Sequence, residues 1–86
     1  MTDMLFEPPV RRSAWTAEAA LHDCVAFRVE SPLGVVGYVD EVVLDEWGVN
    51  VVELGVYGDE RRRMVPVEDV LWVDAHRELV RLRRRV

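Results

Sequence analysis

Pairs of adjacent carboxylates are the most frequent groups in this sequence that could perform chemistry. They are Asp40–Glu41, Asp45–Glu46, Asp59–Glu60 and Glu68–Asp69. Catalytic carboxylates act from the two sides of a cleft, whereas neighbours on a strand point to opposite faces of the sheet. The turn at Asp45–Glu46 also lacks the spaced oxygen ligands of a calcium loop. We therefore interpret all of these pairs as solvated residues of turns and strand ends.

The segment His22-Asp23-Cys24 places an imidazole and a thiol close together in the sequence. A histidine can activate a cysteine nucleophile, but residues this near in the chain do not easily present that geometry. We expect Cys24 to be a small buried apolar residue and His76 to be exposed in a loop. Because the histidines and the cysteine show no zinc-ligand spacing, we predict no enzyme activity, no cofactor and no metal site.

Two arginine clusters, at residues 61–63 and 83–85, are candidate binding groups. They could bind phosphate or an acidic protein, or they could be solvated and neutralise nearby acids. The C-terminal cluster is the better candidate because a tail is free to reach a partner. Its residues are Arg83, Arg84 and Arg85. The formal net charge of −5 disfavours nucleic acid as the partner of the whole domain.

Aromatic residues form the second candidate binding group. Trp47 is predicted in a turn, and Tyr38 and Tyr57 are predicted to point outward from strands. Aromatic residues are enriched in protein interfaces, so these three could form an interface patch. Packing of the N-terminal segment onto them is the alternative interpretation. We expect Trp72, in an apolar strand, to lie in or near the core.

Composition favours one small globular domain. The 86 residues are 50% hydrophobic, with valine dominant and one cysteine, which fits a single domain in a reducing cytoplasm. No apolar run approaches the roughly 18 residues of a membrane-spanning helix. We expect an N-terminal arm over residues 1–20, extended at Pro8–Pro9 or briefly helical from Ser13. The folded domain is expected over residues 21–86, with a basic C-terminal tail.

Beyond this arm the sequence reads as β structure. Short apolar or alternating segments are separated by turn residues, and one helical turn is expected after Pro66, over residues 67–70. The predicted strands cover residues 25–30, 35–44, 49–57, 63–65, 71–73 and 78–82. This pattern predicts a mainly β protein, a small antiparallel β-barrel or roll of about six strands.

The segment from Val35 to Val43 does not alternate strictly. If Val36, Val39 and Val42 all face the core, the strand contains one extra residue, which is a β-bulge. We expect Gly37 to supply the backbone freedom for that bend, and Asp40–Glu41 to lie in water.

These segments resemble the PRC-barrel family. In that family an apolar-Gly-x-apolar-x-acidic-apolar strand is followed by a turn, a valine-rich strand and an apolar-Pro-x-acidic-x-apolar segment. Here the first motif is at residues 36–42 and the last at residues 65–70, and the resemblance covers roughly residues 21–82. PRC-barrel domains occur in the photosynthetic reaction-centre H subunit, in ribosome maturation factors and as stand-alone proteins of bacteria and archaea.

The resemblance implies a binding or scaffolding module with no shared catalytic residues. The first functional hypothesis is therefore a non-enzymatic protein-interaction module that binds a protein partner or a second copy of itself as a homodimer. The alternative is a factor linked to RNA processing or ribosome maturation that binds a ribonucleoprotein. In the maturation factors a separate domain accompanies the barrel, and none is evident in this sequence.

Overall fold

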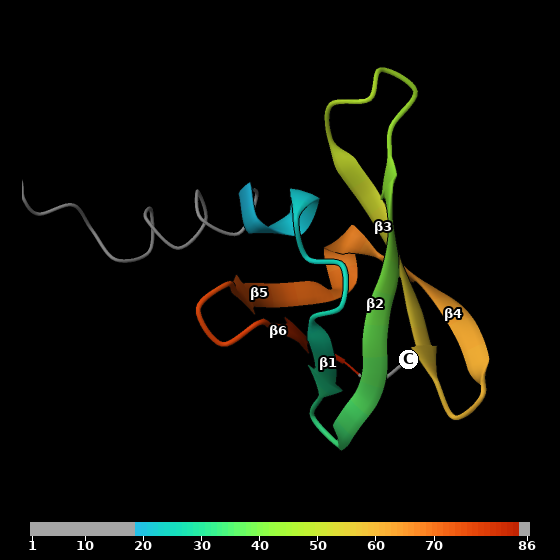
Figure 1. Ribbon diagram of the computed structural model, residues 1–86, viewed down its shortest axis with the longest axis vertical. Helices are drawn as coiled ribbons and strands as arrows, with labels where there is room; N and C mark the ends of the chain where they lie inside the picture. Colours follow the sequence, from blue (N-terminus) through green and yellow to red (C-terminus); the bar gives the residue numbers. More distant parts are fainter. Residues whose placement is uncertain (1–18, 85–86) are drawn as a thin grey trace, which may run out of the picture.

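A computed structural model of the protein describes residues 19–84 (Figure 1). The described part begins with helical residues 19–22, which lie across the predicted boundary between the arm (residues 1–20) and the folded domain (residues 21–86). The rest of the arm, including Trp15, lies outside the described residues. The strands are β1 (Arg28–Ser31), β2 (Gly34–Leu44), β3 (Val51–Gly58), β4 (Arg61–Pro66), β5 (Val70–Asp74) and β6 (Leu79–Leu82), with a 3₁₀ turn, η2 (Val67–Asp69), between β4 and β5. The mainly β prediction, its six strands and the helical turn after Pro66 are confirmed.

The strands form one mixed sheet in the order β4-β3-β2-β1-β6-β5. The prediction that all pairs are antiparallel is wrong at one position, because β1 and β6 run parallel. The β5–β6 hairpin joins the sheet through β6. Three of the four residues of β6 are buried, whereas Leu71 of β5 is half exposed. The more buried strand is therefore the interior one, and its direction in the hairpin makes it parallel to β1.

The predicted closure into a barrel is not present within residues 19–84. Strands β4 and β5 are the two edges of the sheet, and no ladder joins them. They are nevertheless consecutive in the chain, with only the three residues of η2 between them. The two ends of the sheet must therefore approach one another at η2, and β5 and β6 run across the direction of β2 and β3 (Figure 1). The sheet is strongly coiled but open.

The core is formed by side chains of the sheet and of the segment that precedes it. Its fully buried side chains come from every strand except β5, and burying each apolar side chain contributes about 1.5–3 kcal/mol. They are Val29, Val39, Leu54, Val56, Val65, Val80 and Leu82, together with Cys24 before β1. The prediction that Cys24 is a buried apolar residue is confirmed. Burial also raises the pKa of its thiol to about 11.

The first strand begins later than predicted. The prediction placed its start at Val25, but residues 23–27 form a turn in which the Phe27 amide donates to the Cys24 carbonyl at 3.0 Å. Ala26 has a φ of 80°, which lies outside the region of regular strands. The apolar alternation continues through this turn, so alternation alone did not reveal it.

The predicted bulge in β2 is confirmed, and the register shows extra residues at two places in this strand. Val29 of β1 pairs with Gly37 and Glu30 with Val35, so Val36, directly before Gly37, is the extra residue opposite β1. Val39 pairs with Val56 and Glu41 with Gly55, so Asp40 is the extra residue opposite β3. As predicted, Val39 is buried, and Val36 and Val42 pack against the core. Gly37 also has a second role: a Cβ built on it would lie 2.1 Å from the carbonyl oxygen of Tyr57. The glycine allows two backbones to approach closely.

Candidate interaction surface

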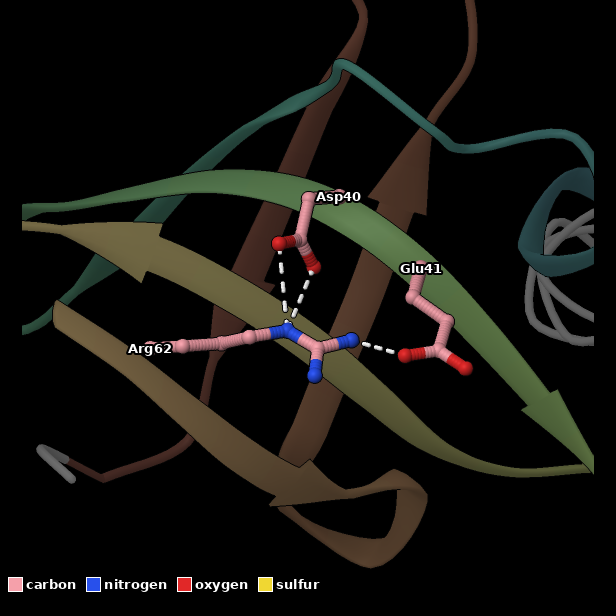
Figure 2. Close-up of polar contacts among 3 residues, drawn as sticks. All are labelled: Asp40, Glu41 and Arg62. Atoms are coloured by element: carbon pink, nitrogen blue, oxygen red, sulfur yellow. Dashed lines mark hydrogen bonds and ion pairs between the residues drawn. The ribbon is translucent and has the colours of Figure 1, made fainter.

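The bulge at Asp40 brings two neighbouring carboxylates onto the same face of the sheet. On a regular strand Asp40 and Glu41 would point to opposite faces, but the extra residue cancels the alternation. Both side chains reach Arg62 of β4 (Figure 2). The Arg62 Nε–H donates to both carboxylate oxygens of Asp40 at 3.1 Å, and an Nη group donates to Glu41. Both carboxylates are exposed to water, as predicted, but they lie on one face of the sheet and share one arginine, which the alternation of a regular strand did not predict.

Arg62 reaches across an intervening strand to make these contacts. It lies on β4, the carboxylates lie on β2, and β3 runs between them. The position that Arg62 crosses is Gly55 of β3, where a Cβ would lie 2.7 Å from both the Arg62 Nη2 atom and an Asp40 oxygen. The missing side chain at Gly55 therefore leaves the space that the ion cluster occupies.

Two tyrosines lie beside this cluster on the same face. The sheet register pairs Tyr38 of β2 with Tyr57 of β3, and Tyr57 with Arg62 of β4. Tyr38 is 56% exposed and Tyr57 is 50% exposed, as predicted for outward-pointing residues. Met64, in the next outward row of β4, is also exposed. We call Tyr38, Tyr57 and Met64, with the Asp40–Glu41–Arg62 cluster, the tyrosine face.

The charges on the tyrosine face are partly neutralised and open to water. Two carboxylates share one guanidinium, so the cluster carries a formal charge of −1. All three side chains are 42–51% exposed, and pairs exposed to this degree contribute only about 0.2–1 kcal/mol each. The main effect of the cluster is therefore to hold charged side chains in place beside the tyrosines.

Trp47 is exposed in the β2–β3 turn and is separate from the tyrosine face. Leu44, the end of β2, lies six residues beyond Tyr38, a span of about 20 Å. Trp47 is 74% exposed, and Val49 in the same turn is also exposed. The sequence grouped Trp47 with the tyrosines as one patch, but the length of the hairpin separates them.

Asp45 organises the turn that presents Trp47. One oxygen of its carboxylate accepts hydrogen bonds from the amides of Trp47 and Val49 at 3.2 and 3.0 Å, and the other accepts from the Asn50 side chain at 3.0 Å. These hydrogen bonds, led by that from Val49, lower the pKa of Asp45. The carboxylate that sequence analysis assigned to solvent is thus a structural acceptor.

The described arginines of the C-terminal cluster contact η2. The Arg83 Nε–H donates to the Glu68 carbonyl at 2.9 Å, and the Arg84 Nε–H donates to the Asp69 carboxylate at 2.9 Å. Asp69 is nearly buried, so Arg84 supplies its counter-charge. These contacts hold the described part of the predicted free tail against the domain, and Arg85 lies outside the described residues.

Over residues 19–84 no group of three or more His, Cys, Asp or Glu side chains is arranged to hold a metal ion. Within the same residues no helix is long and apolar enough to cross a membrane. Comparison of the chain with protein-family models and with curated proteins gives no match. The surface features above are therefore the basis for a functional proposal.

Proposed function

We propose that this protein is a non-enzymatic interaction module of the PRC-barrel type that binds proteins, including a second copy of itself. The observation that carries the proposed binding of other proteins is the tyrosine face. Tyr38 and Tyr57 are cross-strand neighbours, each at least 50% exposed. Aromatic side chains with little rotamer freedom supply much of the binding energy in protein interfaces, and an exposed aromatic pair on a rigid sheet is typical of such a site.

The PRC-barrel assignment is supported by where its motifs lie in the fold. The segment over residues 36–42 lies in β2 and contains the bulge, and Pro66 ends β4 directly before η2. The strong coiling that brings β4 and β5 together at η2 is what an open form of a barrel requires. We propose that the sheet is such an open barrel.

The tyrosine face is tested by using the wild-type protein and variants of it as bait to capture native protein partners. The double variant Tyr38→Ser and Tyr57→Ser should lose a partner that the wild-type protein retains. Leu33→Ser with Val49→Ser is the matched control, because both are exposed apolar residues of turns outside the tyrosine face. The captured protein is then identified, purified and titrated against each variant, and the double variant should bind at least about tenfold more weakly. Equal binding by all variants would contradict the proposal.

The RNA-linked alternative receives no specific support. The net charge is −5, and the described C-terminal arginines, Arg83 and Arg84, contact η2. A salt-dependent mobility shift with ribosomal RNA, lost on replacing Arg61 and Arg63 with alanine, would favour this alternative over the protein-interaction module. Arg83 and Arg84 are poor choices for that test, because their replacement also removes contacts within the domain.

A further inference from the structure

The two edges of the sheet differ in how they are protected against pairing with another strand. An edge strand presents unpaired backbone groups, and charged side chains or proline block their use. The β4 edge carries Arg61, Arg62 and Arg63 and ends at Pro66. The β5 edge has the sequence VLWVD, in which the single charged residue is the last one. Its pairing with β6 is interrupted by a bulge at Leu71. Only β4 is thus protected by charge.

The side chains at β5 favour an apolar contact. Leu71 is 50% exposed, and Trp72 next to it is partly exposed. Asp74, the charged residue of the strand, is already paired with Arg77 at 3.6 Å. An added strand could therefore cover Leu71 and Trp72 without burying an unpaired charge.

The charges flanking β5 indicate which strand could be added at this edge. Glu68 precedes the strand in η2 and is exposed, and Arg77 follows it, with its side chain 74% exposed. In an antiparallel pair of two β5 strands, the end with Glu68 lies beside the end with Arg77 of the second copy. Each such dimer contains this opposite-charge contact twice.

We propose that a second copy of this protein binds at the β5 edge, with the two β5 strands antiparallel and the sheet continuous across the dimer. This inference rests on the proposed self-association and names its location. Two-fold symmetry closes the assembly at two chains, because each copy uses its single β5 edge.

The first experiment measures the mass of the protein in solution over a range of concentrations by light scattering or sedimentation. The wild-type protein should be a dimer, and Leu71→Lys should raise the dissociation constant at least about tenfold by placing a lysine at the shared edge. Leu33→Lys is the control, since Leu33 is an exposed apolar residue in the turn between β1 and β2, outside both edge strands and the tyrosine face, and this variant should remain dimeric. Circular dichroism establishes that both variants fold.

The second experiment tests the charge contact directly and is independent of Leu71. Glu68→Arg should weaken the dimer by placing like charges together, and adding Arg77→Glu in the same chain should restore it. Failure of this rescue, or a dimer that survives Leu71→Lys, would overturn the β5 location and leave self-association intact. A wild-type protein that stays monomeric at all concentrations would overturn the self-association itself, and growth beyond a dimer would overturn the closed two-fold arrangement.

Discussion

At the scale of single residues, the structure assigns different roles to glycines that look alike in the sequence. Gly37 and Gly58 let two backbones approach: a Cβ on Gly58 would lie 2.0 Å from the Val36 carbonyl oxygen. Gly55 makes room for the ends of flexible side chains, those of Arg62 and Asp40. Backbone atoms in a paired strand cannot move away cheaply, whereas long side chains can, so substitutions at these positions should differ in cost.

We expect Gly37→Ala to lower the free energy of unfolding by about 3 kcal/mol, at the upper end of overpacking effects, because β3 must shift to admit the methyl group. In Gly55→Ala, the loss of ion pairs worth about 0.2–1 kcal/mol each is offset by about 0.4–1 kcal/mol from reduced freedom of the unfolded chain. Its stability should therefore stay close to that of the wild type. Urea denaturation measures both values, and a Gly37→Ala protein as stable as the wild type would contradict the close-approach role.

At the scale of elements, the turns determine how the strands are connected. The β3–β4 hairpin has a two-residue turn in which Asp59 and Glu60 have φ values of 54° and 62°. Such a turn matches the twist of the paired strands, but left-handed φ values are costly for residues other than glycine. This hairpin therefore contains strain that a substitution can remove.

Glu60→Gly should raise the free energy of unfolding by about 1 kcal/mol, because glycine adopts this conformation without steric cost. The measurement is the thermal unfolding midpoint. Glu46→Gly in the β2–β3 turn is the matched control, since Glu46 is not among the residues with positive φ, and it should lower the midpoint. A lower midpoint for Glu60→Gly would show that the turn carries no such strain.

The β2–β3 turn should make stability depend on pH through Asp45. Its pKa is lower in the folded protein, so its charged form contributes stability above the unfolded value of about 3.9. This contribution is lost as the pH falls through the lower folded pKa. Asp45→Asn should therefore unfold at a lower temperature than the wild type near neutral pH, and the difference should vanish in strong acid.

Glu46→Gln is the comparison for this pH experiment, because the hydrogen bonds of the turn converge on Asp45 and not on its neighbour. Its unfolding midpoint should follow that of the wild type across the same pH range. A difference between wild type and Asp45→Asn that persists unchanged into strong acid would argue against the charge of Asp45 as the cause.

At the scale of the whole molecule, the core closes over a thiol that can report on unfolding. Cys24 is fully buried and its pKa is raised to about 11. A protonated thiol without solvent contact is a poor nucleophile. Its reaction with a thiol reagent therefore requires the structure to open.

Labelling of Cys24 near neutral pH should be slow in the folded protein and fast in concentrated guanidinium chloride. When opening and closing are fast relative to labelling, the rate follows the population of the open form. The Gly37→Ala variant should then label faster, by about tenfold for each 1.4 kcal/mol of lost stability. Equal labelling rates in the folded and denatured protein would show that Cys24 is accessible without opening.

The sequence determined the strands, because burial of valines, punctuated by turn residues such as Gly58 and Pro66, is a local signal that each segment carries by itself. It also determined the bulge in β2 and the outward orientation of Tyr38 and Tyr57. It did not determine the parallel β1–β6 pair or the open edges, since those depend on which distant strands compete for burial. The Arg62 cluster could not be predicted from the sequence either, because an ion pair across β3 requires both the register that aligns Gly55 with Glu41 and the extra residue at Asp40.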